Sequence, residues 1–113
     1  KEIQLDYDFE PYQFTEYKIG DFYDWHVDVH KYGVYKNRYC SIIVQLNNDY
    51  NGGELQIIDE EDNIINLEKG VGNLFIFLSN LKHRVLPVTD GKRYSLVNWF
   101  SHKNKNQEHK TLL

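Results

Sequence analysis

The sequence predicts a single all-β domain, and three observations support this class. The 113 residues fit one domain and leave no room for a second. The apolar content is carried by rings and branched side chains: the chain has 9 Tyr, 6 Phe and 2 Trp but no Met and no Ala. This composition suits pleated sheets and disfavours a helical bundle. Finally, about seven or eight short apolar segments recur at a spacing of roughly 8–12 residues, which indicates a sandwich, a jelly roll or a small barrel.

The first third of the chain predicts two or three strands. Residues 3–19 alternate loosely between apolar and polar and are interrupted by Pro11, so they hold one or two strands. From residue 22 to residue 30 the alternation is regular. Because side chains two apart in a strand share a face, a strand here directs three polar side chains to one side, those of His26, Asp28 and His30.

The rest of the chain predicts short strands joined by turns. The apolar run 39–46 follows a polar, tyrosine-rich loop at 30–38 and predicts a buried strand. Turn-forming residues are dense in four segments, 47–53, 59–63, 68–72 and 89–92. The segments between them predict further strands at 54–58, 64–67, 73–78, 83–88 and 93–100. From residue 101 the sequence becomes polar, so we expect one domain spanning 1–113 whose last part, 101–113, is a polar tail.

Charge and composition argue against several classes of protein. The net charge is −4 and no basic stripe is visible, so nucleic-acid binding is not expected. No apolar run approaches the roughly 18 residues of a membrane span, and no signal peptide is recognisable. The single Cys40 excludes an internal disulfide and is expected to be a small buried residue. We therefore expect a cytoplasmic protein in a reducing compartment, and the richness in Lys, Asn and Ile suggests a microbial or viral source.

Two features predict a metal site. His26 and Asp28 on one strand face place an imidazole and a carboxylate about 6–7 Å apart at the backbone, where both can bind one ion. Taken alone, this pair is more often a surface His–Asp hydrogen bond. His83 follows the apolar segment LFIFL at 74–78 after a four-residue connection, which puts it near the mouth of the fold. Two His and one carboxylate around a metal are typical of non-haem Fe(II) oxygenases, whereas zinc sites usually have more Cys or His.

A third feature, Arg93-Tyr94-Ser95, predicts an anion site. Arg93 and Ser95 share one face of a strand, and a guanidinium beside a hydroxyl forms a pocket for a carboxylate. The alternative is an edge-strand Arg paired with a surface acid. The rest of this strand is apolar and aromatic, which favours a central strand.

In this order and spacing, the motifs resemble the prolyl 4-hydroxylase-like branch of the Fe(II)/2-oxoglutarate-dependent dioxygenases. The resemblance runs from about Thr15 to Phe100. It rests on the stretch ending in HVD at 26–28, on NGGEL at 51–55, on GNLFIF at 72–77, and on the ten-residue spacing from His83 to Arg93. It implies a double-stranded β-helix (jelly-roll) fold with few or no helices in this chain.

The resemblance also implies roles for particular residues. Fe(II) would be bound by the catalytic residues His26, Asp28 and His83. The co-substrate 2-oxoglutarate would be bound by Arg93, Ser95 and Tyr17, with Gln45 standing where some relatives have Tyr. Aromatic and basic side chains near the mouth are expected to contact the substrate, namely Trp25, Tyr35 and Arg38.

The implied activity is hydroxylation by O₂ and 2-oxoglutarate, with release of succinate and CO₂ and with ascorbate as an optional reductant. The leading substrate is a prolyl residue in a peptide or protein. One alternative is an oxygenase acting on a free amino acid, a small metabolite or a modified base. Another is a non-catalytic jelly-roll binding module. The acidic charge counts against bases, and the complete set of metal and carboxylate ligands counts against the binding module.

Overall fold

The computed structural model describes residues 7–103, which form eleven strands and no helix within that range. The all-β prediction is therefore confirmed. In this part of the chain no helix is long and apolar enough to cross a membrane. The strands are β1 Tyr7–Phe9, β2 Gln13–Tyr17, β3 Tyr23–His26, β4 Arg38–Gln45, β5 Asn51–Gly52, β6 Leu55–Ile58, β7 Ile64–Leu67, β8 Leu74–Leu78, β9 His83–Val85, β10 Val88–Asp90 and β11 Arg93–His102.

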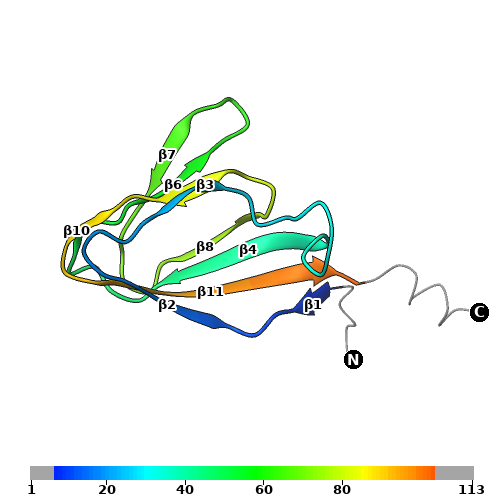
Figure 1. Cartoon of the computed structure of the whole chain (residues 1–113), viewed down its shortest axis with the longest axis horizontal. Helices are drawn as coiled ribbons and strands as arrows, with labels where there is room; N and C mark the ends of the chain where they lie inside the picture. Colours follow the sequence, from blue (N-terminus) through cyan, green and yellow to red (C-terminus); the bar gives the residue numbers. More distant parts are fainter. Residues whose placement is uncertain (1–6, 104–113) are drawn as a thin grey trace, which may run out of the picture.

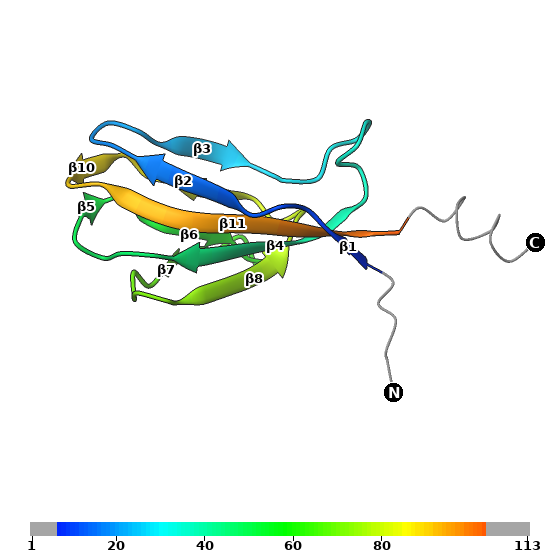
Figure 2. The ribbon, with the colours of Figure 1, turned by 90° about the horizontal axis from the view of Figure 1, so that it is seen from below.

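Two antiparallel sheets face each other, as Figures 1 and 2 show. The major sheet contains β1 and β2, which both pair with β11, followed by β4 and β8. The minor sheet has the order β3-β9-β6-β7. A short ribbon of β5 and β10 lies at one end of the pair of sheets (Figure 1). At the end opposite this ribbon, the segment between β3 and β4 crosses from the minor sheet to the major sheet (Figure 1).

The space between the sheets has an apolar part and a polar part. A buried apolar cluster, with members from β4, β6, β8 and β9, consists of Ile43, Leu55, Phe77 and Val85. Alternation along β4 and β11 also turns polar side chains inward, and four of them are at most 2% exposed: Ser41, Gln45, Arg93 and Ser95. Such residues are costly to bury without partners, so their concentration marks a site.

Several strand predictions agree with the structure to within one or two residues, including those at 39–46, 64–67 and 73–78. The strand predicted at 22–30 is too long, because β3 ends at His26. Beyond it, the main-chain N–H of Asp28 donates to the carbonyl of Ser79, in the turn after β8 of the major sheet, instead of continuing a strand ladder.

The predicted strand 83–88 is wrong in its second half. β9 ends at Val85, and Val88 starts β10, which pairs with Gly52 in the ribbon instead. Pro87 lies between the two strands and has no N–H to offer a ladder. The predicted polar tail also begins too early, because β11 continues to His102 and pairs there with Tyr7. The remainder of that tail, 104–113, lies outside the described residues.

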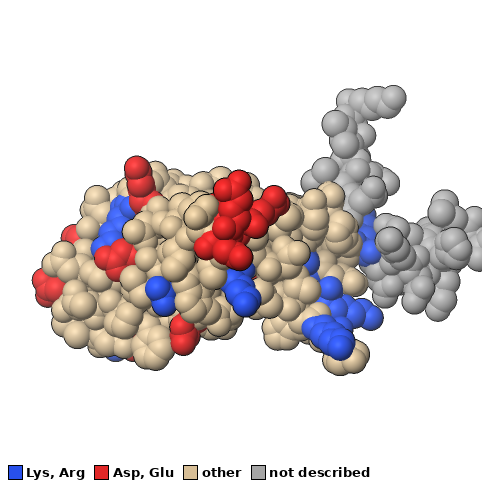
Figure 3. All heavy atoms as spheres, turned by 90° about the horizontal axis from the view of Figure 1, so that it is seen from above, with Lys and Arg blue, Asp and Glu red and all other residues tan. Residues whose placement is uncertain are grey.

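The surface seen in Figure 3 carries no continuous basic stripe. Acidic side chains gather on it, while Lys and Arg are scattered. The turn between β6 and β7 contains four consecutive acids, Asp59 to Asp62. This distribution agrees with the acidic net charge and offers no extended track for a phosphate backbone on this face.

Two glycines with a positive φ angle provide a test of the ribbon. A Cβ at Gly52 would lie 2.3 Å from the carbonyl oxygen of Pro87 and 2.8 Å from the nitrogen of Thr89. A Cβ at Gly20 would meet nothing within 4 Å. We expect Gly20→Ala to cost about 1–2 kcal/mol of unfolding free energy, from backbone strain alone. Gly52→Ala should cost about 3 kcal/mol or more, because the β5–β10 ribbon must also shift. Urea unfolding followed by tryptophan fluorescence measures both, and equal losses would contradict this packing.

Candidate metal centre

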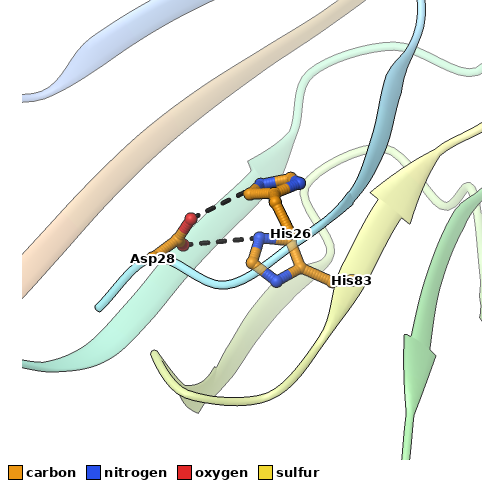
Figure 4. Close-up of side chains that lie close together, drawn as sticks. All are labelled: His26, Asp28 and His83. Carbon is orange, nitrogen blue, oxygen red and sulfur yellow. Dashed lines mark ion pairs between the residues drawn. The ribbon is translucent and has the colours of Figure 1, made fainter. Parts of the chain in front are cut away.

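Three of the residues singled out from the sequence converge between the sheets (Figure 4). His26 ends β3, Asp28 follows two residues later, and His83 starts β9. The two histidines are direct partners in the β3–β9 pairing. Potential ligand atoms of the three side chains all lie within 4.8 Å of one another. The Nε2 atom of His26 is 3.4 Å from Oδ1 of Asp28, and that of His83 is 3.4 Å from Oδ2.

Main-chain carbonyls orient both imidazole rings. Nδ1 of His26 donates to the carbonyl of Asp24 at 2.7 Å, and Nδ1 of His83 donates to that of Leu81 at 2.9 Å. A carbonyl can only accept, so Nδ1 carries a proton. Nε2 then donates to the carboxylate when the ring is protonated and presents its lone pair when the ring is neutral. The ring of Tyr23 stacks on His26 with 3.6 Å between centroids and further restricts its rotation.

Asp28 is held by the opposite sheet. Its main-chain N–H donates to the carbonyl of Ser79 at 2.8 Å. Its Oδ2 accepts the hydroxyl of Ser41 at 2.6 Å and the indole N–H of Trp99 at 2.9 Å. Ser41 lies on β4 and Trp99 on β11, both in the major sheet. The centre therefore combines two histidines of the minor sheet with a carboxylate fixed to the major sheet.

The charges of the centre favour a divalent cation. Burial alone would raise the pKa of Asp28, but hydrogen bonds from His26, His83 and Ser41 outweigh it and hold that pKa well below its usual range. Burial lowers the pKa of His26, and hydrogen bonds to Asp28 and to the Asp24 carbonyl raise it by more, so the net pKa is raised. An ionised carboxylate between two imidazole nitrogens is a ligand set for Fe(II) or a similar ion.

A cavity of about 280 Å³ joins this centre to Arg93. Arg93 is 2% exposed, and its Nε and one terminal nitrogen, Nη2, have no hydrogen-bond partner. Its other terminal nitrogen donates to the hydroxyl of Ser95 at a long 3.4 Å, and its Cζ lies 5.4 Å from the ring of Tyr17. Among residues 7–103, no carboxylate lies within 4.0 Å of it. A buried cation with unused donors fits an anionic ligand such as a carboxylate.

The pocket contains residues that the sequence did not single out. Thr15 also lines the cavity and shares a hydrogen bond with the hydroxyl of Ser95. Gln45, already singled out from the sequence, is not among the residues that line the cavity. Its Nε2 is buried without a partner, while its Oε1 accepts the hydroxyl of Tyr50 at 3.5 Å. Ser41 and Trp99, which hold Asp28, were also missed. Strand alternation could have found both residues. Ser41 shares the inward face of β4 with Gln45, and Trp99 shares the inward face of β11 with Arg93.

The three residues expected to contact substrate have different surroundings. Arg38 lines the cavity, but its Nε and one terminal nitrogen both donate to Glu10 at 2.7 Å. Its guanidinium lies between the rings of Tyr35 and Trp99, 3.8 and 3.9 Å from their centroids. Tyr35 thus contacts Arg38 and does not itself line the cavity. Trp25 is also absent from the cavity wall.

The ring of Trp25 packs instead against Arg84, whose Cζ lies 4.2 Å from its centroid. Two other residues near the mouth, Tyr23 and His30, do line the cavity.

Comparison with known proteins identifies the family. The family model described as the 2OG-Fe(II) oxygenase superfamily matches residues 12–101. A PKHD-type hydroxylase of Psychrobacter sp. (strain PRwf-1) is 33% identical over 110 residues, which cover 91% of this chain and 42% of that protein. A PKHD-type hydroxylase of Shewanella oneidensis is 27% identical, covering 93% of this chain and 49% of that protein. The chain thus spans less than half the length of these relatives.

Solved structures confirm the double-stranded β-helix fold. The prolyl-4-hydroxylase of Pseudomonas putida superposes with a TM-score of 0.74 at 32% identity, covering 85% of this chain and 52% of that one. A prolyl hydroxylase of Trichoplax adhaerens, solved with a peptide fragment of the hypoxia inducible factor oxygen degradation domain, gives 0.74 at 21% identity, covering 85% and 45%. At that identity, the second likeness bears on the fold alone. Because the family match extends over most of its length, this chain belongs to the 2OG-Fe(II) oxygenase superfamily.

Proposed function

We propose that this chain holds the active site of an Fe(II)- and 2-oxoglutarate-dependent dioxygenase that hydroxylates a prolyl residue in a peptide or protein, releasing succinate and CO₂. One observation carries the proposal: the His–Asp–His cluster and the guanidinium of Arg93, two of whose nitrogens have no partner, open into the same cavity. Family membership implies the metal and the co-substrate. Hydroxylation is supported by the PKHD-type hydroxylases, and the prolyl substrate by the prolyl-4-hydroxylase of Pseudomonas putida at 32% identity.

The residues present fit both groups. Nε2 of His26, Nε2 of His83 and the carboxylate of Asp28 would hold Fe(II). When bound there, Fe(II) together with O₂ and 2-oxoglutarate supplies the oxidising power that converts a substrate C–H bond to C–OH. Ascorbate would serve as an auxiliary reductant. The carboxylate stays ionised and the ring orientations are set in advance, so little reorganisation is needed on metal binding.

Arg93 supplies binding and orientation. Its unused N–H donors would bind the far carboxylate of 2-oxoglutarate, while the hydroxyls of Ser95 and Thr15 lie beside it. Because the guanidinium is buried, this ion pair forms away from water and fixes the co-substrate relative to the cluster. Each buried charge of the cavity would then have an opposite charge beside it: the metal ion beside Asp28, and the ligand carboxylate beside Arg93.

The cluster itself is tested by removing its ligands. His26→Ala or Asp28→Ala should abolish succinate formation from 2-oxoglutarate and hydroxyproline formation in a panel of proline-containing peptides. His102→Ala is the matched control, because His102 is exposed and lies outside the cavity. Turnover is measured with Fe(II), 2-oxoglutarate and ascorbate, and hydroxyproline by mass spectrometry. Full activity in either ligand variant would contradict the assignment.

Arg93→Gln tests the anion pocket. We expect weaker binding of 2-oxoglutarate to the metal-loaded protein by about 2 kcal/mol or more, roughly thirtyfold in Kd. The same change should raise the melting temperature of the ligand-free protein, because it removes a buried charge without a counter-charge. Arg84→Gln, at a site outside the cavity, is the control. Calorimetric titration and thermal unfolding check the two expectations, and an unaltered Kd would rule out Arg93 as the anion site.

The pKa of His26 predicts how metal binding depends on pH. A metal binds the neutral imidazole, so a bound proton competes with it. The pKa of His26 is raised above the ordinary histidine value of about 6.5. As the pH is lowered, we therefore expect metal affinity to begin falling before pH 6.5 is reached. It should fall about tenfold per pH unit for each proton that must leave. Asp28 stays ionised over this range. Anaerobic titrations with Mn²⁺ between pH 8 and 5.5 measure this slope, and a constant affinity would contradict it.

A further inference from the structure

The two oxygens of the Asp28 carboxylate have different surroundings. Oδ2 accepts two strong hydrogen bonds, from the hydroxyl of Ser41 at 2.6 Å and the indole N–H of Trp99 at 2.9 Å. Each oxygen also faces one imidazole nitrogen at 3.4 Å, Oδ1 that of His26 and Oδ2 that of His83, so the two donors are what distinguishes them. A carboxylate oxygen has two lone pairs in its plane, so the two donors use those of Oδ2 and leave those of Oδ1 free.

A second serine fixes the direction of the Ser41 hydroxyl. The hydroxyl of Ser79 lies 3.0 Å from that of Ser41, and both residues are fully buried. Ser41 has a single proton, and its distance to Asp28 is the shorter one, so the proton goes to the carboxylate. Ser79 then donates to Ser41. Asp28 is itself 8% exposed, so water hardly competes with this chain of hydrogen bonds.

Trp99 is held just as firmly. Its indole nitrogen is a donor only, and its ring packs under the guanidinium of Arg38 at 3.9 Å. Arg38 is fixed in turn by its two-point pair with Glu10, and it donates to the main-chain carbonyl of Asp28 at 3.3 Å. Three groups of Asp28 are thus held from the side of the major sheet. Ser79, just after β8, accepts from its N–H, Arg38 donates to its carbonyl, and Ser41 and Trp99 donate to one carboxylate oxygen.

We infer that Ser41 and Trp99 are positioning residues that occupy Oδ2 of Asp28, so that the carboxylate offers Oδ1 alone to the metal. The inference rests on the proposed function, which supplies the ion. One oxygen of Asp28 and two nitrogens leave more positions open on the metal than a two-oxygen carboxylate would. A two-point co-substrate and O₂ both require such open positions.

The test measures the affinity of Mn²⁺, from the electron paramagnetic resonance signal of the free ion, on protein confirmed to be folded. Ser41→Ala and Trp99→Phe should each weaken Mn²⁺ binding about tenfold or more, as removal of outer-shell partners does. Ser41→Thr keeps the hydroxyl and should restore most of the affinity. Ser101→Ala and Trp25→Phe are matched controls that leave Mn²⁺ affinity within twofold of the unmodified chain, because neither side chain lines the cavity or bonds to Asp28.

Mn²⁺ affinities of Ser41→Ala and Trp99→Phe within twofold of the unmodified chain would overturn the inference, even if both variants melt earlier, because a merely structural role predicts that result. If Ser41→Ala does not fold, Trp99→Phe decides. Failure of the proposed function has another signature: the unmodified chain binds Mn²⁺ with the expected variant effects but forms no succinate. If the unmodified chain does not bind Mn²⁺, both proposals fall.

Discussion

The carboxylate of Asp28 is the contact on which the rest of the site depends. In sequence it follows β3 of the minor sheet, yet its hydrogen bonds to Ser41 and Trp99 join it to β4 and β11 of the major sheet. The imidazoles of His26 and His83 meet it from the minor sheet. A metal bound by these three side chains would therefore link the two sheets. Since the segment carrying Asp28 leaves the ladder of β3 to make these contacts, the strand ends at His26 because of the site.

Arg93 complements Asp28 at the other end of the same cavity. Each is buried, and each lacks a full opposite charge within the described residues. Asp28 has only two imidazoles beside it, and Arg93 has only neutral hydroxyls and rings. A chain selected only for stability would not keep such a pair of separated charges. A divalent ion at one end and a ligand carboxylate at the other would neutralise both. The cavity is thus built for two ligands that are bound together, which is what the family membership implies.

Much of this arrangement follows from period-2 alternation and residue type. Alternation placed Arg93 and Ser95 on one inward face, and the apolar runs located β4 and β8. It put Tyr23 on the opposite face from His26, which is wrong, because a register shift between the two in the β3–β9 pairing brings Tyr23 into the cavity beside His26. Alternation does not report how far a strand extends or what lies across from it. It therefore overextended β3, whose end is set by contacts with Ser79, far along the chain. It also ran β9 through Pro87, where the ladder changes partner.

The same limit explains the residues that sequence reasoning missed. Ser41 and Trp99 are 13 and 71 residues away from Asp28 in sequence, and only the pairing of β4 with β11 brings them to it. Trp25 was expected to line a substrate groove as one of several aromatic residues in this part of the chain. In the structure it packs against Arg84 and does not line the cavity.

A crystal structure of this chain with Mn²⁺ and an unreactive analogue of 2-oxoglutarate tests the central claim most directly. The account predicts one ion bound by Nε2 of His26, Oδ1 of Asp28 and Nε2 of His83. It also predicts the far carboxylate of the analogue on Arg93, with Oδ2 of Asp28 still bonded to Ser41 and Trp99. An ion held by both oxygens of Asp28, or an analogue whose carboxylate does not reach Arg93, would contradict it.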